Sequence, residues 1–195
     1  MVVSGSFDGT IKVWDLKAKG ERPIVTFGEA RDGVSSAAVR GHEILAGSTD
    51  GRVRCYDLST GEVDTDVLPA AVTSVTPAMD GQSYLASTLD SKLRLMDRVT
   101  GKCLQTFQED GFRSEAYRLR SCFGMADEFV VSGSEDGGVV VWDVLTGTVK
   151  HRLRHAQEGI ESKKSIVSAV ACNQIRKQWA SAGSDGNVIV WGTGE

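Results

Sequence analysis

One strand–turn–strand pattern recurs five times along the chain, and it restricts the possible folds more than any other feature. In every copy an aspartate stands six residues before a bulky side chain. Successive aspartates are separated by 42, 40, 46 and 49 residues, and repetition at this spacing predicts a series of similar structural units. The copies are Val2–Trp14, Ile44–Tyr56, Tyr84–Met96, Phe129–Trp142 and Trp179–Trp191, with turn aspartates Asp8, Asp50, Asp90, Asp136 and Asp185.

Each copy has the sequence pattern of a β-hairpin. In the fourth copy two apolar runs, Phe129–Ser134 and Val139–Trp142, flank the Asp136-Gly137 turn. Glycine takes positive φ without steric cost, so such a turn between β-branched runs is a strong hairpin signal. A strand-rich unit of this length that ends in Trp-Asp is typical of a WD-repeat β-propeller. The second acid is present in four copies as Asp15, Asp57, Asp97 and Asp143, and Gly192 takes its place in the fifth.

The strand pattern predicts five propeller blades, of which three have all four strands. The three complete blades are Gly33–Val39, Ile44–Ser48, Val53–Tyr56 and Glu62–Leu68; Val72–Thr76, Tyr84–Thr88, Leu93–Met96 and Cys103–Phe107; and Glu115–Cys122, Phe129–Ser134, Val139–Trp142 and Thr148–Leu153. The outer two have three strands each: Val2–Ser6, Thr10–Trp14 and Pro23–Phe27; and Ile166–Cys172, Trp179–Gly183 and Asn187–Trp191. We therefore expect an all-β fold, one WD40-type β-propeller domain over residues 1–195 that forms an incomplete arc of five blades. The missing strands favour a C-terminal part of a larger ring, with Met1 an internal methionine; a true start at Met1 stays an alternative.

Three stretches carry a closer resemblance. Glu29–Leu58, Ser87–Asp97 and the turn Ser134–Gly137 resemble the mitogen-activated protein kinase organizer family of seven-bladed WD-repeat proteins. The resemblance implies that the chain corresponds to the late third blade through the seventh. It also implies a scaffold that assembles a kinase signalling complex or, alternatively, a structural component of the spliceosome in pre-mRNA splicing.

The turn aspartates are predicted to have a structural role, because each can accept hydrogen bonds from amides of its own turn. In typical WD repeats the aspartate also joins a network of a histidine, a serine or threonine, and the tryptophan indole. A histidine is not at the usual place, although His155 could replace it in the last blade. Tyr56 and Met96 replace tryptophan in two blades, which are expected to depend on packing alone. The serine positions are Ser4, Ser132 and Ser181, and the tryptophan positions are Trp14, Trp142 and Trp191.

Catalytic, metal and cofactor sites are not expected. The sequence has no Gly-rich phosphate loop, no G-x-S-x-G and no H-E-x-x-H motif, and its three histidines are scattered among polar residues. Asp64 and Asp66 share one side of a strand, but a solvated face is the simpler interpretation. A net charge of −4 gives no reason to expect nucleic acid or a membrane as partner. The four cysteines are far apart and no signal peptide is present, so we expect an intracellular, reduced protein. The expected location is the cytoplasm and nucleus, in keeping with the two roles that the resemblance implies.

Binding of partner proteins remains the expected function. The two longest connectors between blades, Gln108–Ser114 and His155–Ser165, lie on a face that commonly carries partners, and long loops on a rigid scaffold are often functional. Phe112 is expected at a loop tip, where an aromatic side chain would be the best single contact. Solubility alone would also explain each connector charge, and protection of a sheet edge would explain the basic run Lys150–Arg154. The charged candidates for partner contact are Arg31, Arg113, Lys163 and Lys164.

Overall fold

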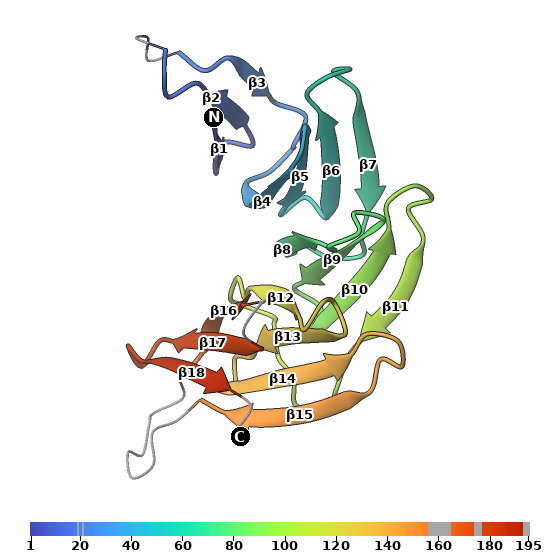
Figure 1. Cartoon of the computed structure of the whole chain (residues 1–195), viewed down its shortest axis with the longest axis vertical. Helices are drawn as coiled ribbons and strands as arrows, with labels where there is room; N and C mark the ends of the chain where they lie inside the picture. Colours follow the sequence, from blue (N-terminus) through green and yellow to red (C-terminus); the bar gives the residue numbers. More distant parts are fainter. Residues whose placement is uncertain (19, 21, 156–164, 174–176, 193–195) are drawn as a thin grey trace.

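The chain folds into five antiparallel sheets that follow one another along an open arc (Figure 1). The structure, a computed structural model, describes all residues except 19, 21, 156–164, 174–176 and 193–195. The first sheet lies at one end of the arc and the last at the other, and no sheet of the described residues joins these two ends (Figure 1). Within the described ranges, no helix has the length and apolar character needed to cross a membrane.

The strands pair in chain order within each sheet. The first sheet contains β1 (Val2–Gly5), β2 (Ile11–Trp14) and β3 (Val25–Phe27). The second contains β4 (Val34–Arg40), β5 (Glu43–Ser48), β6 (Arg52–Asp57) and β7 (Val63–Val67). The third contains β8 (Val72–Pro77), β9 (Ser83–Thr88), β10 (Lys92–Asp97) and β11 (Cys103–Phe107). The fourth contains β12 (Ser121–Gly124), β13 (Phe129–Gly133), β14 (Gly138–Asp143) and β15 (Val149–Arg154), and the fifth contains β16 (Val167–Asn173), β17 (Gln178–Gly183) and β18 (Val188–Gly192).

This arrangement confirms the predicted all-β fold of five blade-like sheets, three with four strands and two with three. The residue after the turn aspartate has positive φ in every copy, as its hairpin turn requires. Glycine fills this place in four copies, for example Gly137 at φ 85°, and Ser91 adopts φ 56° in the third copy.

The expected inner strand Glu115–Cys122 is wrong over most of its length, since β12 begins only at Ser121. The amides of Glu115, Ala116 and Tyr117 all donate to Oε1 of Glu135, at 2.7, 2.8 and 2.9 Å. An amide held in this way cannot also form a strand ladder, so the segment stays a connector.

The core lies between neighbouring sheets. Ile11 and Val13 of the first sheet, for example, pack with Val34, Ile44 and Tyr56 of the second. Similar clusters fill the other three interfaces, and each is built from residues of two successive sheets. Burial of these apolar faces is the main favourable contribution to the packing of the sheets against one another in the arc.

Candidate protein-interaction surface

Four of the turn aspartates hold their own hairpin turns. Each accepts a hydrogen bond through Oδ1 from the amide two residues later. The distances are 2.9 Å for Asp8, 3.1 Å for Asp50, 3.0 Å for Asp136 and 3.1 Å for Asp185. The turns at one end of the sheets are therefore fixed by side chains as well as by the strand ladder.

The fifth sheet brings together the aspartate, histidine, serine and tryptophan that the sequence predicted for the network, with hydrogen bonds among the last three. Trp191 Nε1 donates to Ser181 Oγ at 2.8 Å, and that oxygen also lies 2.8 Å from His155 Nδ1. The hydroxyl can donate its own hydrogen to Nδ1 while it accepts from the indole, in the tautomer that carries the ring proton on Nε2. Nε2 lies 3.5 Å from Oδ1 of Asp185. The first sheet has the shorter form, in which Trp14 Nε1 donates to Ser4 Oγ at 2.9 Å.

The fourth sheet lacks this network although its serine and tryptophan have the same spacing. Ser132 Oγ donates to the carbonyl of Gly133 at 3.0 Å, and Trp142 Nε1 is buried with no hydrogen-bond partner among the described residues. The ring of Phe112 instead meets Trp142 edge-on, with the ring centroids 5.2 Å apart. After β11 the chain has Gln108 and Glu109 where the fifth sheet uses His155, so the histidine of the network has no counterpart here.

Serine-to-alanine changes should lower stability in the fifth sheet, which has the hydrogen-bond network, more than in the fourth sheet, which lacks it. Ser181→Ala is expected to lower the free energy of unfolding by about 1–3 kcal/mol, because it leaves the buried Nδ1 of His155 and the partly buried indole nitrogen of Trp191 without a partner. Ser132→Ala is the matched control, since its hydroxyl is equally buried but bonds only to the adjacent carbonyl, and we expect a change within about 0.5 kcal/mol. Urea denaturation measures both, and equal losses would contradict the network.

A buried arginine completes the network in the two sheets that lack tryptophan, which the sequence interpretation missed. In the second sheet Arg54 is only 4% exposed. Its Nη2 donates to Asp50 Oδ2 and its Nη1 to Ser48 Oγ, both at 2.8 Å, and Ser48 Oγ donates to Asp50. Burial acts to raise the pKa of Asp50, but hydrogen bonds from Arg54 and Ser48 and the guanidinium charge hold that pKa well below its ordinary value.

The third sheet repeats this arrangement. Arg94 donates to Asp90 Oδ2 and to Thr88 Oγ1, both at 2.5 Å, and the threonine hydroxyl donates to Asp90 Oδ1. The expectation that Tyr56 and Met96 leave their sheets dependent on packing alone is therefore wrong. The available signal was an arginine four residues after the turn aspartate in these two copies.

The basic run on β15 is largely engaged within the protein. Arg152 pairs with both Asp136 and Glu109, and Nζ of Lys150 lies 3.4 Å from Asp143 Oδ2. Arg152 also donates to the carbonyl of Gly111 at 3.0 Å, which ties the connector 108–120 to the fourth sheet. Arg152 therefore positions a loop, and two carboxylates neutralise its charge.

Two connectors lie against the hairpin turns and together form one surface, which we call the connector face: residues 28–33, residues 108–120 and the turns β1–β2, β5–β6, β9–β10 and β13–β14. The amide of Arg31 donates to Asp50 Oδ2 at 3.0 Å, and that of Arg113 donates to Ser134 Oγ at 3.1 Å. Partial burial acts to raise the pKa of Glu135, but its three amide donors outweigh that effect and lower the pKa below its ordinary value. The connector backbone is thus fixed at several points by groups of the sheets.

Exposed aromatic and cationic side chains lie on this face. Phe7, in the β1–β2 turn, is 76% exposed, and Tyr117 is 53% exposed. The guanidinium carbon of Arg118 lies 5.9 Å from the centroid of the Phe7 ring, so the connector before the fourth sheet reaches the first sheet. The side chains of Arg31 and Arg113 are also exposed here.

The prediction for Phe112 is wrong, because this side chain is only 4% exposed and packs against Trp142 in the core. Phe7 was the better candidate, and its signal was an aromatic residue directly before a turn aspartate. Lys163 and Lys164 lie outside the described residues.

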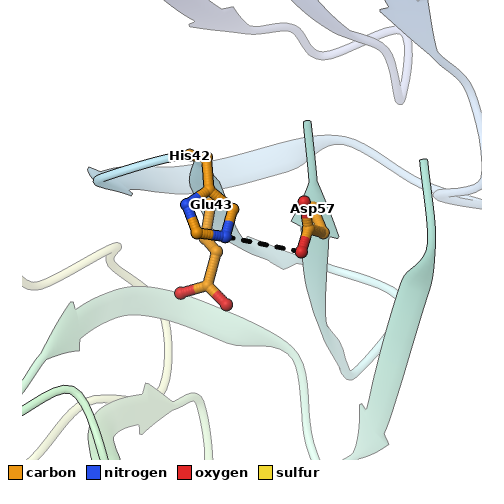
Figure 2. A group of neighbouring side chains, drawn as sticks. All are labelled: His42, Glu43 and Asp57. Atoms are coloured by element: carbon orange, nitrogen blue, oxygen red, sulfur yellow. Dashed lines mark ion pairs between the residues drawn. The ribbon is translucent and has the colours of Figure 1, made fainter. Parts of the chain in front are cut away.

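A second cluster, at the opposite end of the second sheet, brings His42, Glu43 and Asp57 together (Figure 2). The imidazole of His42 faces Asp57, with Nε2 3.5 Å from Oδ2. Glu43 already accepts two hydrogen bonds from Arg98, at 2.5 and 2.6 Å, and Asp57 Oδ1 accepts the amide of Ser59 at 2.7 Å. The carboxylates are therefore satisfied by protein donors, which favours an internal ion-pair cluster over a metal site.

The expectation of a solvated face is correct for Asp64, which is exposed, and needs correction for Asp66. Tyr84 Oη donates to Asp66 Oδ2 at 2.6 Å, which links the outer strand of the second sheet to the third sheet. This bond and burial raise the pKa of the tyrosine, with burial the larger cause.

Comparison with known proteins agrees with this architecture. The family "WD domain, G-beta repeat" matches residues 1–15 and 101–143. WD repeat domain-containing protein 83 from Rattus norvegicus is 44% identical over 146 residues, which are 75% of this chain and 46% of that protein. The Homo sapiens protein of the same name is 45% identical over 127 residues, 65% of this chain and 40% of that protein. The homolog from Dictyostelium discoideum is 24% identical over 225 residues, which cover 100% of this chain and 66% of that protein.

The chain spans about half the length of the curated mammalian relatives that it matches. These relatives confirm the resemblance to the kinase organizer proteins that was read from the sequence. Five repeats, five blade-like sheets and the networks that join turn aspartate to strand all agree with the sequence matches, and the chain belongs to the WD-repeat family.

Proposed function

We propose that this chain is a non-catalytic platform that binds partner proteins through its connector face. WD-repeat proteins are typically non-catalytic and generally bind proteins, which supports the general role. The observation that carries the proposal is Phe7, largely exposed and stacked with Arg118 on a surface whose backbone is fixed by buried networks. Rigid exposed aromatics and arginines contribute much of the binding energy at protein interfaces.

The arginine beside Phe7 favours a partner segment that places an acidic side chain at this point of the surface. Arg118 is exposed and lies over the Phe7 ring, and a cation at the rim of an interface speeds association with an acidic partner. We propose that the partners belong to a mitogen-activated protein kinase module, as the resemblance to the organizer proteins implies, and that the protein acts in the cytoplasm and nucleus. The second candidate is assembly into the spliceosome, which the same resemblance implies.

A matched pair of variants tests the surface. Phe7→Ala combined with Arg118→Glu is expected to reduce capture of the main partner at least about tenfold in affinity purification, because it removes both an aromatic contact and a cation. Leu145→Ala is the control, since Leu145 is 90% exposed in the β14–β15 turn at the other end of the fourth sheet. Circular dichroism should be unchanged for both.

The identity of the captured proteins separates the two candidate functions. Kinases and their adaptors would support the signalling scaffold, whereas splicing factors that are retained after nuclease treatment would support the spliceosomal role. Undiminished capture of every partner by the double variant, or an equal loss with Leu145→Ala, would contradict the connector face as the binding surface.

A further inference from the structure

Two thiols meet between the inner strands of the last two sheets. Cys122 lies on β12 and Cys172 on β16, and their Sγ atoms are 3.2 Å apart although fifty positions separate them in the sequence. A disulfide bond is about 2.05 Å long, so an approach of about 1 Å would complete it. The other two cysteines have different surroundings, because Cys55 Sγ accepts a hydrogen bond from Arg98 at 3.1 Å and Cys103 is exposed.

A groove gives small molecules access to this pair. Cys172 lines an apolar groove of about 330 Å³ between the fourth and fifth sheets, together with Phe129, Leu153, Trp179 and Trp191. The described part of the fifth sheet has three strands, one fewer than the sheet it faces. Both cysteines are only half-buried, so an oxidant that enters the groove can reach sulfur.

The two thiols are also chemically unequal. A thiol–thiol hydrogen bond with Cys122 lowers the pKa of Cys172, and the same contact, with burial, raises the pKa of Cys122. The thiolate is the reactive form of cysteine, so Cys172 is the sulfur that reacts first. The position of Cys172 agrees with its reacting first, because Cys172 is one of the residues that line the groove through which an oxidant would enter.

We propose that Cys122 and Cys172 form a reversible intramolecular disulfide that fastens the fifth sheet to the fourth under oxidising conditions. With hydrogen peroxide as oxidant, the sulfur of Cys172 attacks one peroxide oxygen, the O–O bond breaks, and a sulfenic acid and one water are formed. The sulfur of Cys122 then attacks the sulfenic sulfur, the S–S bond forms, and a second water leaves. The two thiols lose two electrons and two protons, and the peroxide gains them. A thiol reductant such as glutathione reverses the bond and is itself oxidised to its disulfide.

The bond would add a covalent link to an interface that is otherwise held by apolar packing. Val131, Val139 and Val141 of the fourth sheet meet Val167 and Val170 of the fifth. A disulfide here closes a loop of fifty residues, which restricts the unfolded chain and stabilises the folded one. The alternative is that the two cysteines act only as small apolar side chains in the core, in which case oxidation would not join them.

The test uses the full chain with Cys103→Ser, which removes the exposed thiol that could link two molecules. The protein is treated with hydrogen peroxide, its remaining thiols are alkylated, and tryptic peptides are mapped by mass spectrometry without reduction. We expect a peptide in which Cys122 is joined to Cys172, alkylation of Cys55 only, and a melting temperature about 5 °C or more above that of the reduced protein. Dithiothreitol should reverse both changes.

Two variants complete the test. Cys122→Ser in the Cys103→Ser background should abolish the linked peptide and the rise in melting temperature, whereas Cys55→Ser should retain both. Independent alkylation of Cys122 and Cys172 after oxidation, or oxidation of either one only to sulfinic or sulfonic acid, would overturn the proposal. The mapping is done on a protein with both cysteines present, so it does not depend on the folding of the serine variants.

Discussion

Replacing Arg54 with alanine is expected to lower the free energy of unfolding by about 3–5 kcal/mol, since it leaves the carboxylate of Asp50 buried without its cation. The side chains of this pair are only 5% and 6% exposed, so water cannot take over the role of the guanidinium. The hydroxyl of Ser48 would also lose the hydrogen bond that it accepts from the guanidinium of Arg54. Urea denaturation followed by circular dichroism measures the loss.

Arg52 on the same strand provides the control. Its guanidinium is 29% exposed and lies 4.0 Å from Asp50, so Arg52→Ala is expected to cost about 1 kcal/mol or less. In the double variant Arg54→Ala with Asp50→Ala, part of the stability should return, because no charge is then left unpaired. If Arg52→Ala costs as much as Arg54→Ala, Asp50 is not held chiefly by the buried arginine.

Features that depend on residues within one repeat could be predicted from the sequence. The hairpins were predictable because their strands and their turn aspartate lie within a few positions of one another. Arg54 could also have been found by the same reasoning. It stands two residues before Tyr56 on one strand, so both side chains point to the same side of the sheet. The arginine therefore lies on the side of the sheet that the tryptophan occupies in other copies, but it bonds the hydroxyl two residues before the turn aspartate, whereas the indole bonds the serine four residues before it.

Features that depend on another repeat could not be predicted from local patterns. Residues 115–120 were expected to form the first part of a strand, but Glu135 of the next hairpin turn binds three of their amides. His155 was predicted only as a possible member of the network in the last blade, because 26 positions separate it from Ser181; the folded chain shows the contact at 2.8 Å. Phe112 looked like an exposed loop residue because the side chain that covers it, Trp142, lies thirty positions later.

Phe112→Ala is therefore expected to destabilise the protein by about 3–5 kcal/mol, the usual cost of removing a fully buried aromatic ring. The ring is 4% exposed and belongs to the core cluster of Leu85, Phe107 and Trp142, so its removal leaves a cavity between the third and fourth sheets. The edge-on contact with the indole ring would be lost as well. Thermal and urea denaturation both report this loss.

Phe7 provides the opposite case on the same face of the protein. Its ring is 76% exposed, so Phe7→Ala should change the free energy of unfolding by about 0.5 kcal/mol or less. In the affinity purification the order should reverse: Phe7→Ala weakens partner capture, while Phe112→Ala, at a temperature where it is still folded, retains it. Phe112 lies in the core and Phe7 on the surface. Phe112→Ala should therefore lower stability and Phe7→Ala should lower partner binding, and a measurement of each quantity distinguishes the two roles. A Phe112→Ala protein that is as stable as the unmodified chain would contradict the packing of this connector against Trp142.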